Sequence, residues 1–179
     1  LVSGPYNLNA RYTFLEGPRR IFDRAVEVAL TTEQGVTPLR VTVVKAFHEI
    51  THALREYGRL PGGIYGTLLT DKEWQIAVER AKKIGIDKQI TMTDENGKVI
   101  PAIPVYRKWY RQMLRAAGFT GEALDQRIEE LIDQERVANL AEQWATGTSF
   151  GARIDSWFER IVKFFEAIRN AVHGLGFQT

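Results

Sequence analysis

Two histidines and a glutamate with the spacing of a metal site lie close together in the first third of the chain. His48, Glu49 and His52 form the pattern H-E-x-x-H. Because helical residues four apart lie on one face, His48 and His52 can present two imidazole nitrogens to a single ion. Zinc accepts such nitrogens, and it lowers the pKa of a water molecule toward about 7. Glu49 flanks this position, where it can act as the base that takes a proton from that water.

A buried helix, beginning near Pro38 and ending near Tyr57, is predicted to carry these residues. Thr37 and Pro38 make a favourable helix start, because Thr caps free N–H groups and Pro fits the first turn. Gly58 follows the helix, and glycine is common directly after a helix end. The segment is rich in apolar side chains, and a buried polar side chain is costly without a partner. The histidines and the glutamate therefore need partners, and a metal ion would provide one.

A catalytic zinc ion usually has three protein ligands, so a third ligand is expected elsewhere in the chain. The sequence has no cysteine, and the one remaining histidine is His173. The third ligand is therefore most simply a carboxylate. The absence of cysteine also excludes a disulfide framework, and it is compatible with a reducing compartment.

Apolar spacing elsewhere predicts a mainly α chain of the α+β class. Thr70 and Glu73 form a capping box at one helix start, and Thr120 is predicted to cap another. The sequence DENG at 94–97 has the composition of a hairpin turn. The expected helices are 19–30, 70–84, 104–117, 121–145 and 153–172, and the expected strands are 11–15, 88–92 and 98–103.

The C-terminal helix predicted at 153–172 is amphipathic, and its apolar face needs a partner. Packing on the rest of the domain is the default expectation, followed by self-association or docking to another part of a longer protein. Binding of the helix to a membrane surface through its basic residues is a third interpretation. The apolar positions recur in steps of four and three at Ile154, Phe158, Ile161, Phe165, Ile168 and Val172.

The charge and the composition of the chain limit the kinds of partner that we expect it to bind. The chain has 24 Lys and Arg against 22 Asp and Glu, a net charge of +2, so no nucleic-acid partner is expected. No apolar run reaches the roughly 18 residues of a transmembrane segment. A single domain over 1–179 is expected, with a segment of uncertain role at 1–37 and a helix and tail at 148–179. The chain starts at Leu1 rather than Met, which is typical of a fragment of a longer protein.

A second motif extends the pattern. Residues 135–139 read E-x-x-A-N on the helix predicted at 121–145. H-E-x-x-H followed by E-x-x-A-[DN] resembles the gluzincin zinc metallopeptidases, in particular small domains of phage, mobile-element and anti-repressor proteins. The sequences HEITHALR at 48–55, TDKEW at 70–74 and GLGFQT at 174–179 are also similar to metallopeptidase domains of phage large polyvalent proteins.

This resemblance implies a zincin-like fold, one zinc ion per chain and hydrolysis of a protein or peptide substrate. It implies that Glu135 joins His48 and His52 as a ligand, and that Glu49 is the general base. It also places Asn139 beside a ligand histidine as a supporting hydrogen-bond partner. A location in the bacterial cytoplasm or in a virion would follow. A donor to the oxyanion is also required, and the candidates are Tyr57, Tyr65, Tyr106, Tyr110 and His173.

The spacing departs from that of the compact gluzincins, because Glu135 follows His52 by 83 positions (135 − 52). Glu130 and Glu142 therefore remain alternatives for the third ligand. A non-catalytic binding or scaffold module with the same fold is the alternative function. The intact Glu49 favours an enzyme, since a module without turnover has no need of the base.

Overall fold

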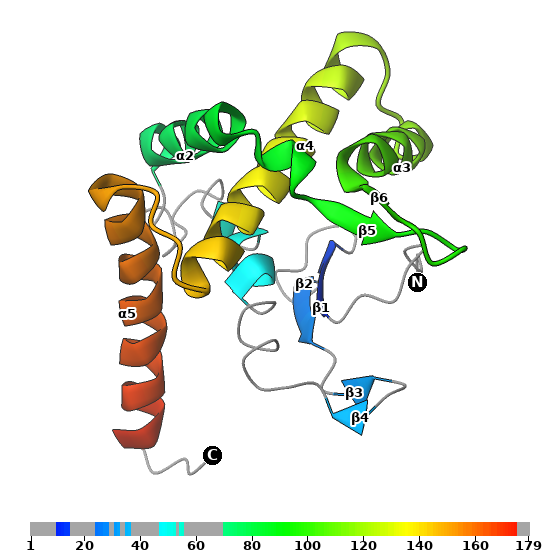
Figure 1. Ribbon diagram of the computed structural model, residues 1–179. Helices are drawn as coiled ribbons and strands as arrows, with labels where there is room; N and C mark the ends of the chain where they lie inside the picture. The colour runs from blue at the N-terminus through cyan, green and yellow to red at the C-terminus, as the bar shows by residue number, and fades with distance from the viewer. Residues whose placement is uncertain are drawn as a thin grey trace.

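Helices dominate the part of the chain that the computed structural model describes, as the sequence predicts. The described residues are 10–14, 24–28, 31–32, 35–36, 47–52, 54–55 and 70–174. The long helices are α2 (Asp71–Ile84), α3 (Ala102–Ala116), α4 (Gly121–Ala145) and α5 (Ala152–Gly174), with a short 3-10 helix, η2 (Ile86–Lys88) (Figure 1). Residues 47–52 and 54–55 are also helical and belong to the predicted metal helix.

The strands form three antiparallel pairs, each of two strands. Two of these hairpins lie in the first 36 residues, and the third connects η2 to α3. The strands are β1 (Ala10–Phe14), β2 (Arg24–Val28), β3 (Thr31–Thr32), β4 (Gly35–Val36), β5 (Thr91–Thr93) and β6 (Val99–Pro101). The strand predicted at 11–15 and the hairpin predicted around residues 94–97 are therefore confirmed.

Local signals predicted several helix ends well. Thr70 and Glu73 form the expected capping box, and Gly85 ends α2 in the left-handed conformation with φ of 67°. Such a φ favours glycine because it has no Cβ. Helix α4 has the predicted bounds, although the Thr120 side chain makes no capping hydrogen bond. Helix α3 begins at Ala102, two residues before the predicted start.

The helix predicted at 19–30 is wrong over residues 24–28, which form β2. Arg24 to Val28 pair with Phe14 to Ala10 in antiparallel register. The segment RAVEV is short, and the β-branched Val26 and Val28 suit a strand. A short apolar run cannot be assigned to helix or strand from its spacing alone, and here pairing with β1 decides the outcome.

Helix α4 is the central element of the described core. It packs against α2, α3 and α5, and Figure 1 shows it crossing the molecule with α2 and α3 on opposite sides. Its Ile132, Val137, Leu140 and Ala141 are fully buried. A helix enclosed in this way has a fixed rotation about its axis. The side chains that α4 directs toward the metal helix are therefore held in position.

An aromatic cluster joins the metal helix to α4 and α5. The rings of Phe47 and Trp144 lie 5.8 Å apart, and both contact Phe158, at 6.1 Å and 5.4 Å between ring centroids. Aromatic pairs at such distances add to the stabilisation that burial alone provides. Phe47 directly precedes His48, so this cluster fixes the first predicted ligand against α4.

Arg55 connects the other end of the described metal helix to α2. Its guanidinium donates to Asp71 at 2.6 Å and lies 4.8 Å from the centre of the Trp74 ring. The side chain is buried, so desolvation strengthens both contacts. Arg55 therefore holds the metal helix against the first turn of α2.

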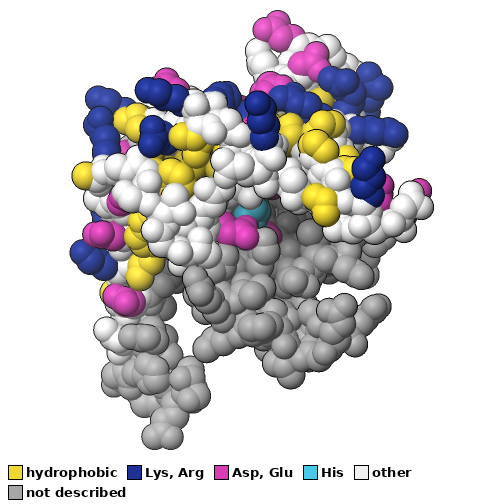
Figure 2. All heavy atoms as spheres, viewed as in Figure 1, with side chains coloured by type: hydrophobic (Ala, Val, Ile, Leu, Met, Phe, Trp, Pro, Cys, Tyr) yellow, Lys and Arg dark blue, Asp and Glu magenta, His cyan; other side chains and the backbone are white. Residues whose placement is uncertain are grey.

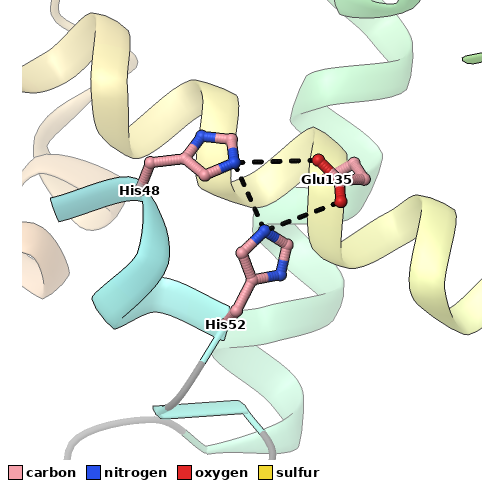
Figure 3. A group of neighbouring side chains, drawn as sticks. All are labelled: His48, His52 and Glu135. Atoms are coloured by element: carbon pink, nitrogen blue, oxygen red, sulfur yellow. Dashed lines mark hydrogen bonds and ion pairs between the residues drawn. The ribbon is translucent and has the colours of Figure 1, made fainter. Parts of the chain in front are cut away.

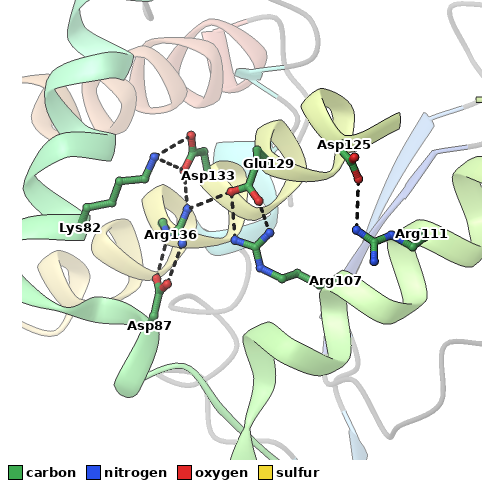
Figure 4. Close-up of polar contacts among 8 residues, drawn as sticks. All are labelled: Lys82, Asp87, Arg107, Arg111, Asp125, Glu129, Asp133 and Arg136. Carbon is green, nitrogen blue, oxygen red and sulfur yellow. Dashed lines mark hydrogen bonds and ion pairs between the residues drawn. The ribbon is translucent and has the colours of Figure 1, made fainter. Parts of the chain in front are cut away.

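A network of charged side chains fixes the face of α4 that is opposite to the metal helix (Figure 4). Arg136 is 5% exposed and binds Asp87 of η2 through two hydrogen bonds, at 2.7 Å and 2.6 Å. It also donates to Asp133 at 2.6 Å, and Lys82 of α2 pairs with the same carboxylate. Glu129 lies at the edge of this network and pairs with Arg107 of α3.

Replacing Arg136 with methionine should destabilise the fold by about 2–4 kcal/mol, because it leaves Asp87 and Asp133 without their buried partner. Urea unfolding of the purified variant measures this change. The matched control is Arg111→Met, since Arg111 pairs with Asp125 in an exposed position and should cost about 1 kcal/mol or less. Equal destabilisation by the two variants would contradict the role given to the network.

Among the described helices, none has a stretch both long enough and apolar enough to span a bilayer.

Candidate metal centre

Three side chains from two helices converge on one point (Figure 3). His48 and His52 project from the metal helix, and Glu135 projects toward them from α4. The two histidine Nε2 atoms lie 3.3 Å apart. Glu135 Oε2 is 3.7 Å from His48 Nε2, and Glu135 Oε1 is 3.7 Å from His52 Nε2. These are the three residues whose pattern in the sequence predicts a zinc site.

The spacing of the three donors fits one tetrahedral ion. Ligand atoms at about 2.0–2.2 Å from a tetrahedral zinc lie roughly 3.3–3.6 Å from one another. The two Nε2 atoms are 3.3 Å apart, and each lies 3.7 Å from a different oxygen of the Glu135 carboxylate. With one ligand atom taken from each residue, the three donors lie within 4.8 Å of one another, close enough to bind one ion. Two histidines and one glutamate are also a donor set found in catalytic zinc sites. The residues present therefore suit zinc in both geometry and chemistry.

The alternative third ligands lie elsewhere. The Glu130 carboxylate accepts from Arg127 at 2.8 Å and is not part of the converging group. Glu142 Oε2 lies 3.3 Å from Nδ1 of His48, which is the nitrogen on the other side of that ring. Of the three carboxylates that the sequence left open, Glu135 is the one that the structure places against both histidine Nε2 atoms.

Tyr110 is hydrogen-bonded to Glu135, the proposed third ligand. Its hydroxyl donates to Glu135 Oε1 at 2.6 Å, a short bond of the kind that a charged acceptor gives. Burial raises the pKa of Tyr110 well above its usual range, and the charge of Glu135 raises it further. The hydroxyl therefore stays protonated and orients the carboxylate. Tyr110 was one of five candidates for the oxyanion donor, and this contact gives it a different task.

The two histidines each have a polar partner behind the ring. His52 Nδ1 lies 3.4 Å from Gln134 Oε1, and His48 Nδ1 lies 3.3 Å from Glu142 Oε2. An acceptor beside Nδ1 favours the proton on that nitrogen, which leaves Nε2 as the ligand atom in neutral imidazole. These partners therefore favour the ring orientation and the tautomer that a zinc ion between the two rings would require.

Asn139 makes a local hydrogen bond within α4. Its amide nitrogen donates to the backbone carbonyl of Glu135, four residues earlier on its own helix, at 2.9 Å. This local bond competes with longer contacts, because the acceptor is always within reach of an Asn at this spacing. Gln134 and Glu142, which the sequence analysis did not assign to this task, lie beside the two histidines. Glu142 had a signal in its spacing, because a residue seven positions after Glu135 lies on the same helix face, whereas Gln134 had none.

Glu49 and Tyr106 complete the surroundings of the site. Glu49 is buried on the metal helix, and its charge contributes to the raised pKa of His48. Burial raises the pKa of Tyr106, as do the charges of Glu135, Glu49 and Glu142. The Tyr106 ring is half-buried one helical turn before Tyr110, and no hydrogen bond of its hydroxyl is found within the described part of the chain.

The remaining candidate donors lie outside the described structure. Tyr57 and Tyr65 are not among the described residues, and the side chain of His173 at the end of α5 is not described either. Figure 2 shows a histidine side chain with acidic side chains beside it in a recess of the surface.

Opposite charges stabilise the metal-free site. Burial lowers the pKa of His48, but the neighbouring carboxylates of Glu135 and Glu142 outweigh burial and raise that pKa to about 9. Burial raises the pKa of Glu135, but the charge of His52 and the contact with His48 outweigh it and lower that pKa to about 2. At neutral pH the metal-free site therefore holds a proton on His48 beside an ionised Glu135.

These shifts predict how stability depends on pH. The pKa of His48 is raised from 6.5 to about 9, so its contribution is complete below pH 6.5 and is lost as the pH rises through 9. Chelator-treated protein should lose on the order of 1–3 kcal/mol of unfolding free energy between pH 6.5 and pH 9.5. Urea unfolding at several pH values measures this loss. In the control variant His48→Gln the loss should be absent, and an equal loss in this variant would contradict the assignment.

Comparison with protein-family models, with curated proteins and with solved structures finds no match for this chain in any of the three. A functional assignment therefore depends on the geometry of the site and on the motifs in the sequence.

Proposed function

We propose that this chain is a zinc-dependent metallopeptidase domain of the gluzincin type. The observation that supports it most strongly is the convergence of His48, His52 and Glu135 at separations of 3.3–3.7 Å. The H-E-x-x-H and E-x-x-A-N motifs alone do not fix how two helices face each other. Their meeting in space, with one ligand atom from each residue within 4.8 Å of the others, is an independent reason to infer a zinc site.

The residues have distinct tasks in this proposal. When bound, zinc supplies a Lewis acid that polarises the scissile carbonyl and activates a water molecule. Glu49 takes the proton from the attacking water and later gives it to the amine that leaves. Its burial favours this task, because a desolvated carboxylate is a stronger base than an exposed one. Tyr110 and Gln134 orient Glu135 and His52 through their hydrogen bonds.

Tyr106 is the described residue best suited to stabilise the oxyanion of the tetrahedral intermediate. Burial raises the pKa of its hydroxyl, and the charges of Glu135, Glu49 and Glu142 raise it further, so the hydroxyl stays protonated. A protonated phenol is a hydrogen-bond donor, and a donor beside developing negative charge lowers the barrier. Tyr110, by contrast, already donates to Glu135.

The proposal extends to the fold and the biological setting. A helix with two histidine ligands beside a second helix with a carboxylate ligand supports a zincin-like fold. The sequence resemblance supports an origin in a phage or a mobile element, with a protein or peptide as substrate. A place in the bacterial cytoplasm or in a virion would suit such a domain. Self-association or docking through the helix at 153–172 belongs to the same proposal.

Metal content is the test of this proposal. We expect about one zinc per chain, by mass spectrometry of protein purified without added metal or chelator. The His52→Ala variant is the control and should contain much less zinc. A wild-type protein that holds no zinc, even after reconstitution, would contradict the proposal. Zinc binding without cleavage of any protein or peptide would favour the non-catalytic module instead.

A further inference from the structure

The structure places Glu142 in contact with a proposed ligand, although neither motif includes this residue. We propose that Glu142 is the positioning residue for His48, whose Nδ1–H it holds so that Nε2 faces the ion. This inference rests on the proposed zinc site. It gives Glu142 the task that the sequence pattern assigns to Asn139, one helical turn earlier on the same helix.

The first support is the geometry of α4. Glu135 and Glu142 are seven residues apart, which is two helical turns, so both side chains leave α4 on the same face. The His48 ring lies between their carboxylates. Its Nε2 is 3.7 Å from Glu135, and its Nδ1 is 3.3 Å from Glu142. Helix α4 therefore carries both Glu135, which would bind the same ion as His48, and Glu142, which orients the His48 ring.

The second support is the burial of His48 Nδ1. This atom is inaccessible to solvent and has no fully aligned hydrogen bond. Water therefore cannot satisfy it, and Glu142 Oε2 is the acceptor that lies beside it. A buried polar atom without an acceptor costs about 1–3 kcal/mol, so a small rotation of the Glu142 carboxylate toward Nδ1–H is favoured.

The third support is the difference between the partners of the two histidines. His52 is oriented by the neutral amide of Gln134, whereas His48 faces a carboxylate. A carboxylate makes the imidazole a more basic ligand than an amide does. Removal of Glu142 should therefore weaken the bond of His48 to the metal and allow the other tautomer.

The experiment compares zinc affinity, by competition with a chelator, in Glu142→Leu, Glu142→Gln and wild type. Loss of a group that orients a metal-binding histidine typically costs about 10–100-fold in metal affinity. We expect that loss in Glu142→Leu and a loss below about tenfold in Glu142→Gln, which keeps an acceptor oxygen. The matched control is Glu122→Leu, an exposed carboxylate of α4 far from the site, with no change expected.

Two further readouts separate positioning from other roles. Cobalt-substituted wild type and both Glu142 variants should keep the same tetrahedral absorption spectrum, because the ligands themselves are unchanged. Circular dichroism should show equal helix content in the metal-free proteins. Partial rescue by Gln together with equal helix content would exclude a loss of affinity through unfolding.

The outcomes that overturn the inference are distinct from failure of the proposed function. Wild-type affinity in Glu142→Leu would overturn it and leave the zinc site in place. An altered cobalt spectrum, with equal losses in the Leu and Gln variants, would make Glu142 a ligand rather than a positioning residue. A wild-type chain that binds neither zinc nor cobalt would refute the proposed function itself, and the inference with it.

Discussion

Replacing Glu135 with alanine should abolish stoichiometric zinc binding. Among the described carboxylates, Glu135 is the one whose two oxygens each lie 3.7 Å from a histidine Nε2, so the variant has two ligands on one helix and none on α4. Removal of a group that only supports a ligand costs about 10–100-fold in affinity, and loss of a ligand itself should cost more than 100-fold. Chelator competition and the zinc content of the purified variant measure this change.

The matched control is Glu130→Ala. Glu130 lies on the same helix, and the sequence alone leaves it open as the third ligand. Its carboxylate binds Arg127 at 2.8 Å, away from the histidines, so the variant should keep about one zinc per chain. Zinc retained in Glu135→Ala but lost in Glu130→Ala would show that the third ligand is misassigned. Zinc retained in both would move the site to another carboxylate.

Loss of Glu135 also changes the metal-free protein. The Tyr110 hydroxyl would lose its acceptor, and the proton on His48 would lose one of its two carboxylate partners. Glu135→Gln keeps an acceptor for Tyr110 and is the milder variant. If it also fails to bind zinc while its unfolding free energy stays close to wild type, the loss of metal cannot be attributed to unfolding.

Elements with strong local signals were predictable from the sequence. The start of α2 is encoded by a capping box and its end by Gly85, and both depend on contacts within a few residues. The bounds of α4 follow from a long apolar period that ends near Thr146. Strand β2 was missed because its conformation depends on pairing with β1, ten or more residues away.

The candidate site also has one part that was predictable from the sequence and another part that was not. H-E-x-x-H is a local pattern on one helix, so its geometry follows from helical spacing alone. The contacts of Tyr110, Gln134 and Glu142 depend on how α3, α4 and the metal helix are rotated against one another. That rotation is set by distant contacts such as those of Arg136 with η2 and of Phe47 with Trp144. No short sequence motif encodes the rotation of these helices against one another.

Replacing Glu49 with glutamine should leave zinc bound and reduce the rate of cleavage by about 10²–10⁴-fold. Glutamine has nearly the same shape, but it cannot accept the proton of the attacking water. Glu49 is no member of the converging group, so the ligand set stays intact. The measurement is the rate of cleavage of a protein substrate by zinc-loaded wild type and variant, beside their zinc content.

The Glu49 comparison needs controls for charge and for metal. Glu79→Gln makes the same change at an exposed position of α2 and should keep the wild-type rate. Chelator should inhibit the wild type, and added zinc should restore it. Cleavage by Glu49→Gln at the wild-type rate would show that the base is another group. Loss of zinc from this variant would instead assign Glu49 to the structure of the site, and its role in proton transfer would have to be tested with the metal restored.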